Sequence, residues 1–150
     1  MEIPLIKKFE AGFRAGVQAV RPNAQVLVKY AGTTGTAFKD PTKGKELALA
    51  EYHDGADVIF HASGSTGLGV FEAARELDKL AIGVDSDQND EAPGHVLTSM
   101  VKRVDTAVFD TIHEVLLDHW QGGIRTFGLA EERCQLGVRR AATRRSCRTR

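Results

Sequence analysis

The sequence lacks the features that would place it in several common classes of protein. Its 150 residues carry 20 Lys and Arg against 20 Asp and Glu, so overall charge does not point to a nucleic-acid or membrane partner. No apolar run approaches the roughly 20 residues that a membrane-spanning helix needs. The start, Met1-Glu2-Ile3-Pro4, has neither the basic nor the apolar region of a signal peptide. A chain of this length can bury its own core, so we expect one globular domain.

Motifs for metal binding and nucleophilic catalysis are also missing. The two cysteines, Cys134 and Cys147, fit neither a CxxC metal site nor a disulfide framework. His113-Glu114 and His119 form HExxxxH, which places the two imidazoles on different helix faces, unlike the HExxH of zinc enzymes. No serine stands in a GxSxG elbow. We therefore predict no metal, no cofactor and no catalytic residue.

Apolar periodicity and turn residues predict alternating helices and strands. Helices are expected over residues 5–20, 41–52, 68–77 and 104–120, and strands over Gln25–Tyr30, Asp57–Ala62, Leu80–Val84, Val96–Met100 and, as one more candidate, Ile124–Phe127. Asp40 before Pro41 is a typical helix start, with the acid as N-cap and proline at the first helical position. Near-continuous apolar strands between helices are typical of a parallel sheet covered on both faces, so the expected class is α/β.

Polar loops follow the predicted strands. The loops are Ala31–Phe38, Ser63–Gly67 and Asp85–Asn89, and Lys102 follows the run Val96–Met100. The carboxyl ends of parallel strands meet at one edge of a sheet, and ligands bind outside that edge in folds of this kind. The sequence therefore gathers these residues into one candidate site.

Several residues of this site have more than one interpretation. The GxxGxG run from Gly64 is either a tight turn that requires small residues or a helix start whose amides face an anionic or hydroxylated ligand. Asp85 and Asp87 are a general acid–base pair, acceptors for the vicinal hydroxyls of a sugar, or solvated loop carboxylates. Lys102 either donates to the same hydroxyls or is a surface lysine.

Two rings also lie near this edge. Phe38 either stacks on a flat base or sugar face, or folds onto the local core. His61, at the end of a predicted strand, is interpreted as a side chain that lies behind the ligand-contacting residues.

Several segments together resemble a known family, the BMP/PnrA-type substrate-binding lipoproteins of bacterial ABC transporters. The resemblance covers roughly Ile3–Leu129 and rests on "IPLIKKFEAGFRAGVQAV", "VLVKYAG", "FKDPTKGKELALAEYHDGADVIFHASGSTGLGVFEAA", "GVDSDQN" and "VLTSMVKRVDTAVFDTI". It implies a type I periplasmic-binding-protein fold, with two Rossmann-like lobes joined by a hinge. It also implies a non-enzymatic protein that binds purine or related nucleosides between the lobes and delivers them to an ABC transporter permease.

The resemblance also implies roles for individual residues. Phe38 would stack on the base, Asp85 and Lys102 would hold the ribose hydroxyls, and Gly64 would bring the backbone close to the ligand. Asp87 is expected among the ligand-binding residues beside Asp85. Location on the outer face of the cell membrane would depend on a lipid anchor that this chain does not contain.

Matched to the family, the chain divides into unequal parts. Residues 1–98 resemble most of the second lobe, 99–103 a hinge crossing, 104–120 a helix that belongs with the first lobe, and 121–130 a return strand. Residues 131–150 hold seven arginines and two acids, and we expect this segment to be an aberrant or disordered tail rather than a basic functional arm.

Two other classes of function stay open on the residues alone. One is a Rossmann-like enzyme that acts on a nucleoside or sugar, with Asp85 as its base. The other is the ligand-sensing domain of a transcription regulator. The missing nucleophile and metal motifs favour the binding protein over the enzyme.

Overall fold

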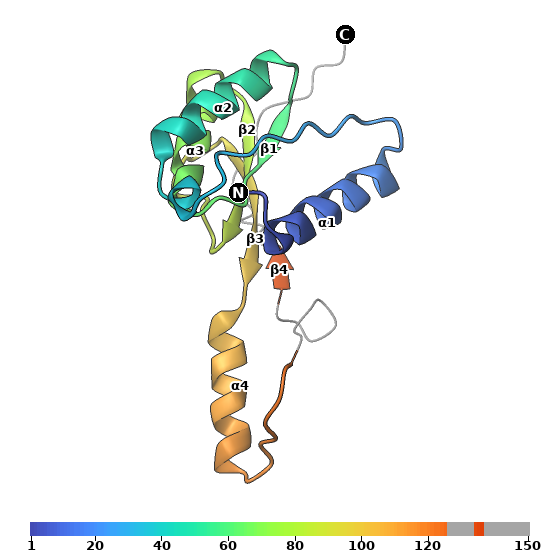
Figure 1. Ribbon diagram of the computed structural model, residues 1–150, viewed down its shortest axis with the longest axis vertical. Coiled ribbons are helices and arrows are strands. Elements are labelled where there is room, and N and C mark those ends of the chain that lie inside the picture. Colours follow the sequence, from blue (N-terminus) through green and yellow to red (C-terminus); the bar gives the residue numbers. More distant parts are fainter. Residues whose placement is uncertain (126–133, 137–150) are drawn as a thin grey trace.

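The computed structural model describes residues 1–125 and 134–136, and the four helices and the strands β1, β2 and β3 lie close to where the sequence predicts them (Figure 1). The helices are α1 (Pro4–Val20), α2 (Pro41–His53), α3 (Gly67–Glu76) and α4 (Val104–Leu116), with short 3-10 turns η1 (Gly35–Phe38) and η2 (Gly64–Thr66). The strands are β1 (Val58–Phe60), β2 (Leu80–Asp85), β3 (Val96–Lys102) and β4 (Cys134–Leu136).

The four strands form one sheet in the order β1-β2-β3-β4. The first three are parallel, and β4 is antiparallel to β3. The register sets Gly83 beside Ser99 and Asp85 beside Val101. The carboxyl ends of β1, β2 and β3 therefore share one edge, as expected for a parallel sheet.

The core lies where α2 and α3 pack against the sheet. Its buried members are Ala48, Tyr52, Ile59, Val70, Phe71, Ala73, Ala74, Ala81 and Ala92. Two glycines let the helical segments meet backbone to backbone. A Cβ added to Gly44 would lie 2.0 Å from the Thr66 carbonyl oxygen, and one added to Gly69 would lie 1.9 Å from the Pro41 carbonyl oxygen. Larger side chains at either position would force the segments apart.

α1 and α4 stand apart from this core. Neither helix has a single buried residue, and Figure 1 shows α4 projecting beyond the end of the sheet. The exposed apolar side chains on and just after α4 are Val104, Val108, Phe109, Ile112, Val115, Leu116, Leu117 and Trp120. α1 touches β1 through Phe13, whose ring stacks on Phe60 with 5.2 Å between centroids.

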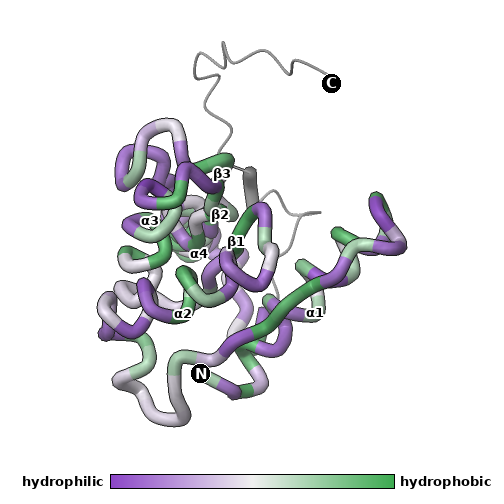
Figure 2. The backbone as a smooth tube through the Cα atoms, turned by 90° about the horizontal axis from the view of Figure 1, so that it is seen from above, coloured by the Kyte–Doolittle hydropathy of each residue, from purple (hydrophilic) through white to green (hydrophobic). Residues whose placement is uncertain are grey.

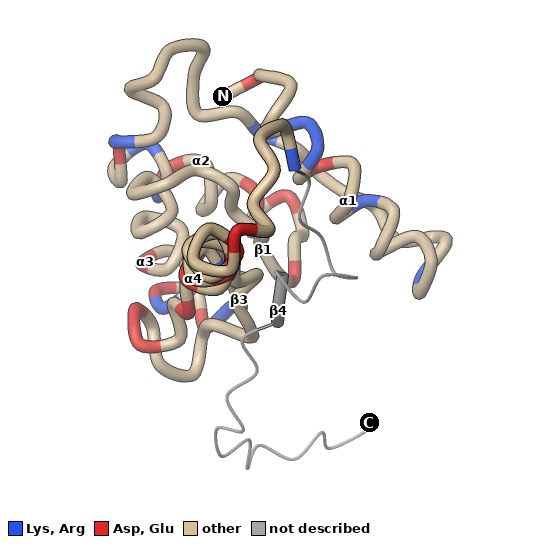
Figure 3. Tube along the Cα trace, turned by 90° about the horizontal axis from the view of Figure 1, so that it is seen from below, with Lys and Arg blue, Asp and Glu red and all other residues tan. Residues whose placement is uncertain are grey.

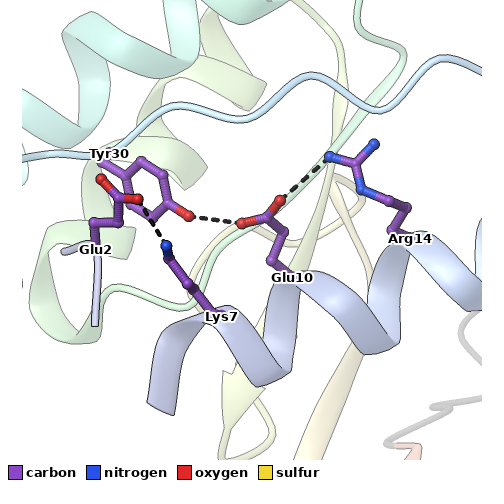
Figure 4. A network of polar contacts seen from close by, with 5 residues as sticks. All are labelled: Glu2, Lys7, Glu10, Arg14 and Tyr30. Atoms are coloured by element: carbon purple, nitrogen blue, oxygen red, sulfur yellow. Dashed lines mark hydrogen bonds and ion pairs between the residues drawn. The ribbon is translucent and has the colours of Figure 1, made fainter. Parts of the chain in front are cut away.

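The strand predicted at Gln25–Tyr30 does not form, so that prediction is wrong. The segment has no regular structure and runs alongside α1 (Figure 2). Leu27 and Val28 are exposed, and Val26 is half-buried. The Tyr30 hydroxyl donates to Glu10 of α1 at 2.6 Å, within the polar network of Figure 4. This segment, α1 and β1 all line a cavity of about 930 Å³. The run is held by a helix rather than by a neighbouring strand, which explains the missing pairing.

The described residues bear only in part on two expectations for the end of the chain. Residues 121–125 form no strand, and residues 126–130 of the expected return strand lie outside the described residues. Within the segment expected to be an aberrant or disordered tail, Cys134–Leu136 form β4, which pairs with Met100, Val101 and Lys102 of β3. Strand pairing uses backbone groups, so β3 accepts this partner despite the arginine-rich composition around it. The other residues of 131–150 lie outside the described residues.

Candidate functional site

Asp85 and Lys102 meet where β2 and β3 end side by side. Lys102 Nζ lies 2.7 Å from Asp85 Oδ1, and the two side chains are 43% and 55% exposed. The ammonium also lies 5.0 Å from the centre of the Phe9 ring of α1. This exposed ion pair is the charged centre of the carboxyl edge.

The chain turns sharply after Asp85. Its φ of 68° lies in the left-handed region, which side chains other than glycine adopt at a cost, although Asp tolerates it better than most. The Ser86 amide donates back to the Val84 carbonyl at 2.8 Å, which closes a tight turn. The carboxylate is thereby held at the strand end instead of continuing along the strand direction.

Gln88 anchors this turn from behind. Its Oε1 accepts from the Val84 amide at 2.8 Å and lies 3.1 Å from His61 Nε2, and its own amide donates to Ser99 Oγ at 3.0 Å. Because the Val84 N–H points at Oε1, that atom is the acceptor, and His61 must carry its proton on Nε2. Ser99 is completely buried. The loop after β2 is therefore tied to β1 and β3 as well as to its own strand.

His61 sits behind the Asp85 loop, where its position at a strand end placed it. It is 4% exposed, and its ring meets Phe71 edge to face with 5.0 Å between centroids. Burial lowers the pKa of His61 to about 4, against the opposing effects of the Gln88 hydrogen bond and the Asp85 charge. The ring is neutral at pH 7. Its Nδ1 has no hydrogen-bond partner within the part of the chain that the structure describes.

Phe38 and Gly64 lie against each other at the neighbouring loop. Gly64 has a φ of 57°, and a Cβ added there would lie 3.0 Å from the Phe38 carbonyl oxygen. Ser65 Oγ donates to the same oxygen at 3.0 Å, and Thr66 Oγ1 donates to the Ala37 carbonyl at 2.8 Å. The loop that carries Phe38 does not follow a strand, but these bonds hold it against the turn that follows β1.

Asp87 is engaged within its own loop. Its Oδ1 accepts from the Asn89 amide nitrogen at 3.1 Å and from Asn89 Nδ2 at 2.6 Å. This arrangement favours a carboxylate that stabilises the turn over a general acid–base partner for Asp85. Contact of Asp87 with a ligand stays a prediction.

Sequence reasoning included Gln88 only as part of the polar loop Asp85–Asn89, and it missed the anchoring roles of Gln88 and Ser99. The available signal was Gly83, which the register sets beside Ser99: a Cβ there would lie 2.5 Å from Ser99 Oγ and 2.9 Å from Gln88 Oε1. A glycine inside a buried strand often marks a close approach of other groups. The approaching groups here are the two that anchor the loop.

The site is an open surface rather than the cavity of about 930 Å³, whose lining includes none of the five predicted ligand-binding residues. In residues 1–125 and 134–136, no cluster of three or more His, Cys, Asp or Glu is placed to hold a metal ion. No helix in those ranges has the length and apolar content to cross a membrane. Figure 3 shows acidic and basic residues interspersed along the described trace. The described part of the chain therefore presents no extended field of one sign (Figure 3).

Comparison with known proteins finds similarity over most of the chain. A family model described as "ABC transporter substrate-binding protein PnrA-like" matches residues 1–143. The "CD4+ T-cell-stimulating antigen" of Listeria monocytogenes is 42% identical over 145 residues, covering 85% of this chain and 40% of that protein. The "ABC transporter nucleoside-binding protein BmpA" of Lactococcus lactis is 34% identical over 161 residues, covering 95% of this chain and 45% of that protein.

A solved structure shows the same fold. The solute-binding protein of an ABC transporter system from Aeropyrum pernix superposes with a TM-score of 0.77 at 32% identity, over 92% of this chain and 39% of that one. The predicted α/β class, with the parallel sheet of a type I periplasmic binding protein, is thereby confirmed. The chain spans about 40% of the length of the curated relative from Listeria.

Proposed function

Because the chain belongs to the PnrA-like family of ABC transporter substrate-binding proteins, we propose that it supplies one wall of a nucleoside-binding site. The whole protein would capture a nucleoside outside the cell membrane, to which a lipid anchor attaches it, and pass the ligand to the permease of an ABC importer. No reaction accompanies binding in this proposal. The family and the name of the Lactococcus relative support it.

The exposed pair of Asp85 and Lys102 is the observation that carries the proposal. A carboxylate accepts hydroxyl hydrogens, and an ammonium donates to hydroxyl oxygens, so the pair offers both functions side by side. Lys102 contacts Asp85 Oδ1 at 2.7 Å, which leaves Oδ2 and two further ammonium protons for a ligand. Two adjacent ribose hydroxyls match this arrangement, and a free base does not.

Phe38 and Gly64 serve the rest of the ligand in this proposal. The half-buried Phe38 ring would stack on the base, and Gly64, with no side chain, would let the backbone approach the ligand. Asp87 lies two residues beyond Asp85 and would contribute through the loop it stabilises. An enzyme that uses Asp85 as a base is less well supported, because Lys102 already pairs with that carboxylate.

Titration with adenosine, 2′-deoxyadenosine and adenine tests the proposal. The chain supplies one wall, so we expect affinity in the millimolar range, about 4 kcal/mol, which NMR titration can follow. Adenosine should shift the backbone signals of Asp85 and Lys102, and adenine should leave them unchanged, because it has no hydroxyls for the pair. Equal shifts with adenine and adenosine would contradict ribose recognition.

Removal of the carboxylate should remove the binding. Asp85→Ala leaves the ligand hydroxyls and Lys102 without an acceptor, at a cost of about 2–4 kcal/mol, so no saturation should be detectable at millimolar adenosine. Glu46→Ala is the matched control, because it breaks another exposed ion pair, Lys43–Glu46 at 2.9 Å, on α2. If both variants bind like the native chain, Asp85 does not contact the ligand.

A further inference from the structure

The hydrogen bonds around Gln88 hold a single arrangement of the loop after β2. The side chain reaches back four residues to the Val84 amide at 2.8 Å, and the main chain reaches across to Ser99 Oγ at 3.0 Å. His61 Nε2, from the segment after β1, meets the same Oε1 at 3.1 Å. One residue therefore connects the end of β2 with groups on both neighbouring strands.

Asp85 lies within the segment that these bonds close. It is the residue directly after Val84 and the third before Gln88, and its φ of 68° is a conformation that needs support from its surroundings. The Val84 amide and the Gln88 main chain are the two fixed ends of that segment. The Ser86–Val84 bond closes the turn across Asp85 itself, and the Gln88 bonds fix the two ends of the segment.

Two glycines make room for the groups that anchor the loop. Gly83 leaves room for Ser99 Oγ and Gln88 Oε1, which would lie 2.5 Å and 2.9 Å from a Cβ there. Gly67 does the same for His61, whose ring atoms would come within 2.2 Å of a Cβ. Ser99 and His61 are buried, so their hydrogen bonds to Gln88 are shielded from water on that side.

We infer that Gln88 is a positioning residue: it fixes the left-handed backbone of Asp85 and so aims the carboxylate at Lys102 and the ligand. The inference deepens the proposed function and rests on it for the ligand, but not for the geometry. If loss of the Gln88 bonds leaves the competent loop populated about one-tenth of the time, apparent affinity falls about tenfold.

Two substitutions at Gln88 distinguish the effect of its hydrogen bonds from the effect of its side-chain size. Gln88→Met keeps the length of the side chain and removes the acceptor, whereas Gln88→Glu keeps an acceptor oxygen for Val84 and His61. The readout is the strong intraresidue amide–Hα NMR cross-peak that marks a left-handed residue, measured for Asp85. We expect it to be lost in Gln88→Met and retained in Gln88→Glu. Ser86→Ala, an exposed change in the same loop, is the control and should also retain it.

Adenosine titration of the same variants gives the second readout. We expect Gln88→Met to bind at least tenfold more weakly than the native chain, and Gln88→Glu to recover most of the affinity. A retained cross-peak in Gln88→Met, or a lost cross-peak with unchanged affinity, would overturn the inference. If the native chain does not bind adenosine, the proposed function fails, and the cross-peak alone decides whether Gln88 positions Asp85.

Ser99→Ala covers the case in which Gln88→Met does not fold. It removes only the acceptor of the Gln88 amide and keeps the side-chain anchor. We expect a weakened Asp85 cross-peak with intact signals from α2 and α3. An unchanged cross-peak in Ser99→Ala would overturn the role of this contact.

Discussion

The body of the molecule, here β1, β2 and β3 with α2 and α3, differs sharply from the two outlying helices, α1 and α4. α1 has the clearest apolar face in the sequence, yet it buries no residue. α2 has a much weaker pattern, yet it buries Gly44, Ala48 and Tyr52. An apolar face predicts that a helix forms, but burial depends on a surface shaped to receive it. Within the described chain, only α2 and α3 find such a surface.

Truncation of one phenylalanine in each region should give the largest difference in the free energy of unfolding. Phe71 in α3 is 2% exposed, and Phe109 in α4 is 67% exposed. Phe71→Ala should lower the free energy of unfolding by about 3–5 kcal/mol through lost burial and a residual cavity. Phe109→Ala should change it by less than about 0.5 kcal/mol. Urea unfolding of both variants measures this, and equal losses would show that α4 is packed in solution.

Acid should lower the stability of the body of the molecule, because His61 becomes protonated. The pKa of His61 is lowered to about 4 in the folded chain, so the unfolded chain binds a proton first as pH falls. The contribution of the neutral ring is complete above about pH 6.5 and declines toward pH 4, by about 1.4 kcal/mol per unit and about 3 kcal/mol at most. Unfolding measured from pH 7 to 4.5 should show this slope in the native chain and not in His61→Gln. Identical slopes would mean that the ring is accessible to protons.

Removal of one tyrosine hydroxyl in each region should give the smallest difference in stability. The Tyr52 hydroxyl donates to the Leu80 carbonyl at 2.8 Å in the body, and the Tyr30 hydroxyl donates to Glu10 at 2.6 Å beside α1. Tyr52→Phe should cost about 1–1.5 kcal/mol, because the ring is buried and the bond is shielded. Tyr30→Phe should cost less than about 0.5 kcal/mol, because water replaces the partner. A larger cost for Tyr30 would show that α1 and the segment Gln25–Tyr30 are part of the cooperative unit.

The sequence predicted well what depends on local chemistry. Asp40 caps α2 by accepting from the Lys43 amide at 2.9 Å, as its place before Pro41 indicates. The parallel strands and their common edge also follow from apolar runs and loop positions. The strand at Gln25–Tyr30 was predicted wrongly, because β propensity says that a run suits a sheet but not that a neighbour is there to pair with it.

The candidate site was predictable in its exposed residues and not in its support. Asp85 and Lys102 are visible as polar residues at the ends of apolar runs, and topology brings them together. Gln88 and Ser99 carry no such signal, because their importance comes from a register that sets Ser99 beside Gly83. Which residues face each other on neighbouring strands depends on the strand register, which cannot be read from a single sequence.

The segment Gln25–Tyr30, wrongly predicted as a strand, lies near an edge of the sheet that has no pairing partner among residues 1–125 and 134–136. In the described residues β1 pairs on one side only, with β2, so the backbone groups on its other side can dock any extended segment. The run Gln25–Tyr30 lines the same cavity as β1 without pairing with it. In the described residues the sheet therefore ends at β1 with backbone groups that a further strand could extend.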